Sequence, residues 1–210
     1  MLRDPFGVFR KRVDLASQRQ PLVLENEHTG ERLELRRILL DGEPCLEIRG
    51  SLPPRSEGPP LHIHHSEHES GTVQRGVLTA LVDGQRIQAG PGESAELPMG
   101  SAHRWWNEGD EPLEFVGHAR PVVDLDRYLQ AVFDVINNSP PERPSLVYLA
   151  HAILRHRKTQ TVLVMPRPIQ AVVFRLAYLL GVITGRYRGD DWPGCPSKCT
   201  GAPVTATEDA

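Results

Sequence analysis

The chain has 210 residues and a mass of 23.4 kDa, enough for one complete hydrophobic core with a further segment beside it. Its net charge of −3 and its pI near 6.3 argue against a general nucleic-acid binder, because such domains usually carry a marked basic surplus. Three cysteines are too few for the disulfide framework of a small secreted domain. The first residues lack the pattern of a signal peptide, so we expect a cytoplasmic protein.

Residues 1–20 are mixed and partly basic, which is typical either of a loosely ordered terminus or of a short arm that packs on a neighbour. From residue 21 onward, short apolar runs are separated by turn-forming residues, and Asp83-Gly84 is a strong two-residue hairpin signal. Many short strands at this spacing predict an all-β sandwich or barrel. The predicted strands cover residues 21–25, 32–40, 44–50, 60–65, 76–82, 85–88, 93–97, 102–106 and 113–119.

The pattern changes to helical spacing near Asp124, and Ser145 and Pro168 can open two further helices that run to about residues 156 and 185. The third helix is apolar but too short to span a membrane, so we expect no integral membrane segment. We expect it to pack on the barrel or on a partner subunit, with a helix lying on a membrane surface as the alternative. The predicted organisation is an N-terminal arm (1–20), a barrel (21–122), a helical extension (123–190) and a disordered tail (191–210).

The tail contains Cys195 and Cys199, which lack a second pair of ligands. We interpret them as two free thiols, with a metal knuckle or a redox pair as the alternatives.

A cluster of histidines is the strongest chemical signal in the chain. Four of the nine histidines lie between His62 and His68, and Glu69 follows immediately. On an extended strand alternate side chains share a face, so His62 and His64 point to the same side and can grip one ion. Imidazoles suit iron, nickel, zinc, copper or manganese, and an added carboxylate favours the harder, often redox-active members of that group.

These residues resemble the two motifs of the cupin superfamily. The first motif is His-x-His, three or four residues (four in this chain), Glu, six residues and Gly. The second is Gly, five residues, Pro-x-Gly, two residues, His, three residues and Asn. One departure is Ser56, where the family has glycine, although Gly58 lies close. The residues that fill the two motifs are His62, His64, Glu69 and Gly76, then Gly92, Pro98, Gly100, His103 and Asn107.

The resemblance implies a mainly β protein, a double-stranded β-helix or jelly-roll cupin barrel, here with a C-terminal helical appendage. It also implies that His62, His64, Glu69 and His103 hold one divalent transition metal. Iron, nickel or manganese is expected first, with zinc or cobalt as alternatives. Glu69 and His103 are the candidate catalytic residues, and a purely structural ion or a vestigial site are the alternatives.

Strand alternation from His103 places Trp105 and Asn107 on the interior face, and Gly71 would also face inward and leave room for a substrate. Trp105 either walls a substrate pocket or simply fills the core. His65 and His68 are interpreted as surface residues, with hydrogen bonding behind a ligand or proton shuttling as the alternative. Inward-facing polar residues are otherwise scarce, which favours an apolar or aromatic substrate.

The leading functional hypothesis is a mononuclear non-haem dioxygenase that acts on a small organic molecule. The first alternative is a metal-dependent isomerase, epimerase or cyclase, which consumes no oxygen. The second is a non-enzymatic cupin that binds a small ligand. No basic helix-turn-helix is present in the sequence, so no nucleic-acid partner is expected. We expect a homodimer, as for many cupins.

Overall fold

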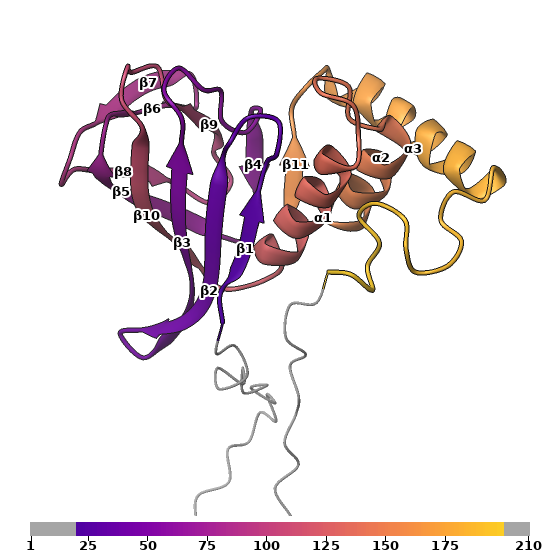
Figure 1. Ribbon diagram of the computed structural model, residues 1–210, viewed down its shortest axis with the longest axis horizontal. Helices are drawn as coiled ribbons and strands as arrows, with labels where there is room; N and C mark the ends of the chain where they lie inside the picture. The colour runs from indigo at the N-terminus through magenta and orange to yellow at the C-terminus, as the bar shows by residue number, and fades with distance from the viewer. Residues whose placement is uncertain (1–19, 200–210) are drawn as a thin grey trace, which may run out of the picture.

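The computed structural model describes residues 20–199 and shows a β-barrel joined to three helices (Figure 1). The barrel is made of two antiparallel sheets. One has six strands in the order β1-β2-β3-β10-β5-β8, and the other has five in the order β11-β4-β9-β6-β7. The strands are β1 (Leu22–Glu25), β2 (Arg32–Leu40), β3 (Glu43–Leu52), β4 (His62–His64), β5 (His68–Arg75), β6 (Leu78–Val82), β7 (Gln85–Ala89), β8 (Ser94–Leu97), β9 (Ala102–Trp106), β10 (Leu113–Arg120) and β11 (Gln160–Val162).

The predicted jelly roll is confirmed, because strands that are distant in sequence alternate between the two sheets and enclose one core. Two-residue hairpins build two of the corners. Asp41 and Gly42, and likewise Asp83 and Gly84, have positive φ angles, as a type I′ turn requires. Alternate residues point inward. The buried side chains of the three central strands include Leu33, Leu35, Leu46, Ile48, Leu52, Leu113, Phe115 and Ala119.

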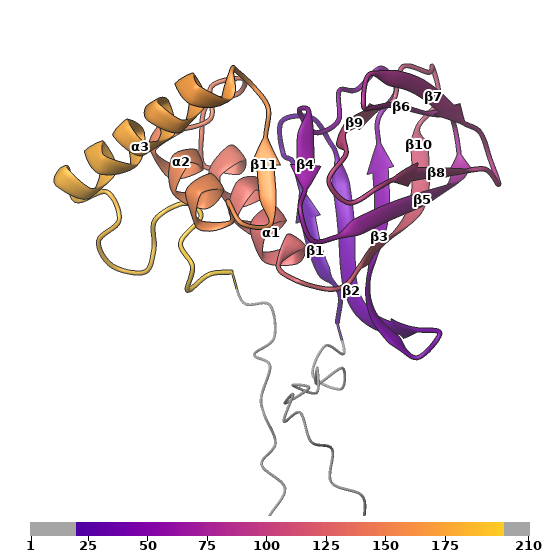
Figure 2. The ribbon, with the colours of Figure 1, turned by 180° about the vertical axis from the view of Figure 1, so that it is seen from behind.

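The three helices are α1 (Leu125–Asn137), α2 (Leu146–Arg155) and α3 (Arg167–Ile183). Figures 1 and 2 show α1 against the barrel, α2 beside it and α3 at the outer edge of the molecule. Within residues 20–199, no helix is long and apolar enough to cross a membrane.

The extension also contributes a strand that the sequence did not predict. Between α2 and α3, β11 pairs antiparallel with β4 and forms the fifth strand, at the edge of the five-stranded sheet. The extension is thus hydrogen-bonded into the barrel at the strand that carries His62 and His64.

Residues 191–199, which the sequence analysis assigned to a disordered tail, pack on the helices. The backbone N–H of Gly194 donates to the carboxylate of Asp134 at 2.6 Å, and Cys195 is buried. Cys195 and Cys199 are free thiols. Burial raises the pKa of Cys199 to about 11, so its thiol stays protonated at neutral pH. The remaining residues of the predicted tail and most of the predicted arm lie outside the described part of the chain.

A buried ion pair fastens the first helix to the barrel. The guanidinium of Arg37, at an inward position of β2, donates to both carboxylate oxygens of Asp126 in the first turn of α1, at 2.7 and 2.9 Å. Both side chains are less than a tenth exposed. A carboxylate in the first turn also suits the positive end of the helix dipole.

We predict that Asp126→Ala lowers the free energy of unfolding by about 3 kcal/mol, because it removes the carboxylate from beside a buried guanidinium. Urea unfolding followed by circular dichroism measures the change. The matched control is Asp110→Ala, which removes the carboxylate from an exposed pair with Arg55 and should cost less than about 1 kcal/mol. Equal losses in the two variants would show that the buried pair does not anchor α1.

Candidate metal centre and cavity

The four predicted metal ligands converge inside the barrel, and they come from both sheets. His62 and His64 lie on β4, and His103 is the direct register partner of His62 on β9. Glu69 lies on β5 in the opposite sheet. One potential ligand atom from each of the four lies within 4.8 Å of all the others. The cluster therefore joins the two sheets at one point.

Hydrogen bonds decide which ring nitrogens face the centre. Nδ1 of His62 lies 2.8 Å from the carbonyl oxygen of Pro60, and Nδ1 of His103 lies 3.2 Å from that of Ser101. A carbonyl oxygen can only accept, so both Nδ1 atoms carry the proton and both Nε2 atoms present a lone pair. Within the described chain, Nε2 of His103 is buried and has no hydrogen-bond partner. A metal ion would satisfy this nitrogen.

The other distances fit a shared ion. Nε2 of His62 and Nε2 of His64 are 3.0 Å apart. Oε2 of Glu69 lies 3.5 Å from Nε2 of His64, and the same oxygen lies 3.8 Å from Nε2 of His103. Three ring nitrogens and a carboxylate oxygen thus surround one small volume, as ligands of a single ion do.

Burial sets the protonation states that a metal site needs. Desolvation, aided by the neighbouring imidazoles, lowers the pKa of His62 to about 3, and burial lowers the pKa values of His64 and His103 to about 4. Burial raises the pKa of Glu69, because water no longer stabilises its charge. Neutral imidazole is the form that binds metal. A divalent cation would supply the positive charge that the buried Glu69 carboxylate needs beside it in order to ionise. The donor set fits a divalent transition metal and leaves coordination positions open.

A buried polar chain supports His64 from behind. Gln160, on β11, is the direct register partner of His64 on β4. The side-chain amide of Gln160 donates to Oε2 of Glu67 at 2.7 Å. Nδ1 of His64 and Oε1 of Gln160 are both buried with no hydrogen-bond partner of standard length in residues 20–199, and Gln160 raises the pKa of His64 as a hydrogen bond would. Gln160 and Glu67 thus form a buried polar pair beside this candidate ligand, and the sequence alone pointed to neither residue.

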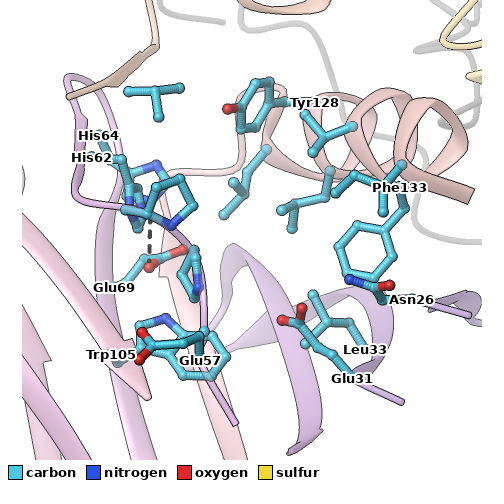
Figure 3. A pocket seen from close by; sticks show the side chains of 18 of the residues that line it. Asn26, Glu31, Leu33, Glu57, His62, His64, Glu69, Trp105, Tyr128 and Phe133 are labelled. Carbon is cyan, nitrogen blue, oxygen red and sulfur yellow. Dashed lines mark hydrogen bonds and ion pairs between the residues drawn. The ribbon is translucent and has the colours of Figure 1, made fainter. Parts of the chain in front are cut away.

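An elongated cavity of about 540 Å³ runs from the metal centre toward the helices (Figure 3). His62, His64 and Glu69 line one part of it. The helical extension supplies much of the remaining wall, which is apolar. Its wall residues include Leu129 and Phe133 from α1, Leu149 and Ile153 from α2, Val162 from β11 and Phe174 from α3.

The predicted substrate-binding residues divide into two groups. Trp105 and Gly71 line the cavity, whereas Asn107 is not among its lining residues. The Asn107 amide instead donates to the carbonyl oxygens of Pro53 at 2.9 Å and Glu111 at 2.8 Å. Asn107 is fully buried, so its amide serves the loops at the end of β9.

Gly71 leaves space for a ligand. A Cβ at this position would meet only Phe115, at the ordinary contact distance of 3.9 Å. Phe115 packs edge-to-face on Trp105, with ring centroids 5.0 Å apart, and both rings line the cavity. The glycine of the preceding loop, Gly58, serves another purpose, because a Cβ there would lie 2.0 Å from the backbone oxygen of Trp105.

The other members of the histidine cluster lie outside the metal centre. Nε2 of His65 is 2.8 Å from the hydroxyl of Thr161, and Nε2 of His68 is 2.7 Å from the carboxylate of Glu96. Both residues are exposed, as expected. His68 is the first residue of β5.

Glu31 adds a second titratable group to the cavity wall. Figure 3 shows it beside Leu33, away from the histidines. Desolvation by burial raises the pKa of Glu31 to about 7. A carboxyl group that is substantially neutral near pH 7 keeps this part of the cavity compatible with an apolar molecule.

The comparisons with known proteins assign the barrel to a family. Residues 48–118, which contain all four candidate ligands, match the family described as Cupin domain. The barrel is a cupin domain. The matched range ends before α1, so the helical extension lies outside it.

Among curated proteins, the chain is 35% identical over 79 residues to Oxidoreductase iacF from Pestalotiopsis fici, which covers 36% of this chain and 39% of that relative. The match thus spans less than half of either protein. Among solved structures, a sugar phosphate isomerase of the cupin superfamily from Silicibacter pomeroyi matches with a TM-score of 0.38 and 22% identity, over 44% of this chain and 60% of that one. A predicted oxalate decarboxylase from Thermotoga maritima matches with a TM-score of 0.38 and 24% identity, over 48% and 90%.

We predict that the double variant His62→Ala, His64→Ala loses bound transition metal, because two of the four donors disappear. Inductively coupled plasma mass spectrometry of protein reconstituted with iron, manganese or nickel measures the content. The matched control is His65→Ala, His68→Ala, which removes two adjacent histidines that face away from the centre and should retain the metal. Equal metal in both double variants would place the ion elsewhere.

We also predict a pH-dependent effect of Glu31→Gln. The pKa of Glu31 rises from 4.5 to about 7 on folding, so its contribution to stability is present below about pH 4.5 and is lost as the pH rises through 7. The glutamine side chain of the variant does not titrate, so only the wild type loses this contribution. The difference in unfolding free energy, Glu31→Gln minus wild type, should therefore rise by about 2 kcal/mol between about pH 4.5 and 7.5. Urea unfolding across this range measures the difference. Exposed Glu27→Gln is the control, and a pH-independent difference for Glu31→Gln would contradict the prediction.

Proposed function

We propose that this cupin is a mononuclear, metal-dependent non-haem dioxygenase that acts on a small, largely apolar organic molecule. The observation that carries the proposal is the position of the His62, His64, Glu69 and His103 cluster, which opens into an apolar cavity of about 540 Å³. A volume of this size is typical of sites for small organic ligands. The relative whose name is Oxidoreductase iacF adds support for redox chemistry.

The four ligand residues would hold iron, nickel or manganese, with zinc or cobalt as alternatives. When bound, such an ion supplies Lewis acidity toward a hydroxyl or enol oxygen and, if redox-active, a means of activating dioxygen. The chain's own residues do the rest. Glu69, whose carboxylate oxygen lies near the ring nitrogens of His64 and His103, would take the proton from a substrate hydroxyl. Gln160, which pairs with His64 across β11 and β4 and donates to Glu67, would orient the ring of His64 from behind.

The cavity walls decide which molecule fits. Trp105 and Phe115 offer flat apolar surfaces in the cavity wall, and the absent side chain of Gly71 leaves the space beside Phe115 open. The helices line the far part of the cavity with apolar side chains, which would disfavour water there, and a drier site would strengthen electrostatic interactions at a bound metal. These features support an aromatic or otherwise apolar substrate that carries one oxygen function.

We predict that metal-reconstituted protein consumes oxygen with at least one member of a panel of apolar enols and phenols. Glu69→Gln and His103→Ala should each lower the rate by about 100-fold, because they alter the metal's ligands. His68→Ala is the control and should keep the wild-type rate. Gly71→Val should retain the metal but bind the substrate more weakly, since its side chain would occupy the cavity.

The same screen separates the alternatives. Turnover that is identical without oxygen would favour an isomerase, epimerase or cyclase. Saturable ligand binding without turnover would favour a non-enzymatic binding cupin. Metal-independent oxygen uptake would contradict the proposal. The expected homodimer and cytoplasmic location are part of the same proposal, and the sedimentation experiment below measures the oligomeric state.

A further inference from the structure

The outer side of α3 exposes a continuous stripe of large apolar side chains. These residues recur every three or four positions, so they lie on one side of the helix. Each is between 50% and 72% exposed, whereas an ordinary surface helix turns its apolar side chains inward. We call this stripe the outer face of α3. Its members are Ile169, Val172, Leu176, Leu179, Leu180 and Ile183.

The rest of the described chain does not cover the outer face. The opposite side of α3 makes the packing contacts, with Phe174 and Ala177 buried against Ala150 of α2. Figures 1 and 2 both show α3 at the edge of the molecule, with α2 toward the barrel. The helix is thus apolar on two sides, and one of them faces away from the protein.

The surroundings of the outer face are strongly basic. Residues 143–189 contain eight lysines and arginines and neither aspartate nor glutamate, a charge of +8 in a chain whose net charge is −3. Arg167, Arg175, Arg186 and Arg188 lie on α3 or just after it, and all are exposed. None of the four makes an ion pair within residues 20–199. The remainder of the chain is acidic, so the charge is divided between two parts of the molecule.

We propose that the outer face of α3 docks on an anionic lipid surface, with the helix lying in the plane of the membrane. Apolar side chains along one side and arginines beside them are the features of an interfacial helix. The arginines would meet anionic headgroups while the outer face enters the boundary of the acyl chains. The acidic remainder of the chain would be repelled, which orients the barrel away from the lipid.

A second copy of the chain suits this face less well. A symmetric dimer through α3 would bring the exposed arginines of both copies together, and no described acidic residue lies within 143–189 to offset them. A dimer formed through another surface leaves the outer face available. The docking proposal is independent of the reaction that the metal centre carries out.

The test is flotation of the full-length, metal-loaded protein with phosphatidylcholine vesicles that contain or lack phosphatidylserine. We expect at least about tenfold stronger binding to the anionic vesicles, and a steep loss of binding at high salt. The double variant Leu176→Gln, Ile183→Gln should abolish binding. Its matched control is Leu39→Gln, Met99→Gln, which changes two apolar residues of similar exposure on the barrel and should bind like the wild type.

Circular dichroism shows whether the variants fold, and sedimentation velocity gives the oligomeric state of each. Equal binding to neutral and anionic vesicles, or no binding by the wild type, would overturn the proposal. So would a wild-type dimer that the α3 double variant converts to a monomer, because a second copy would then cover the outer face. Loss of vesicle binding with an unchanged sedimentation coefficient would support it.

Discussion

The contact between the barrel and the helical extension depends on the carboxylate of Glu67, which accepts hydrogen bonds from two parts of the extension. It is fully buried, so its oxygens need partners inside the protein. The backbone N–H of Val123 donates to it at 3.1 Å, that of Leu125 at 3.4 Å and the Gln160 amide at 2.7 Å. Burial raises its pKa to about 7, against the opposing effect of these donors. One side chain beside the metal motif thus fixes both the start of α1 and the position of β11.

The parts of the fold that follow from local pattern were predictable. Strand alternation placed His62 and His64 on one side, and two-residue turns such as Asp83-Gly84 gave the corners. Helical spacing placed the second helix at 145–156, and the structure has it at Leu146–Arg155. The four candidate ligands came from two separated motifs with fixed spacing, and the structure brings all of them together. Their role as metal ligands stays a prediction.

What could not be predicted depends on pairing between distant residues. β11 is only three residues long, and nothing in its sequence indicates that it will join β4. Glu67 had the appearance of a solvated residue within a polar run, and its burial follows from partners some 56 to 93 positions away. Asn107 does point inward, but its side-chain amide already donates to the carbonyl oxygens of Pro53 and Glu111 and is not available to a ligand. An exposed apolar stripe such as that on α3 is likewise visible only once the packed side of the helix is known.

The cavity has one further consequence, which concerns how such a protein can change. All four candidate ligands lie within the matched cupin range of 48–118, whereas much of the apolar wall comes from residues after 124. The chemistry of the ion and the shape offered to its reaction partner are therefore encoded in separate stretches of the chain. Substitutions at Leu149, Ile153 or Phe174 can reshape the chamber while leaving every donor atom where it is. The helical extension is thus the natural place to redesign selectivity, and the barrel the place to exchange the metal.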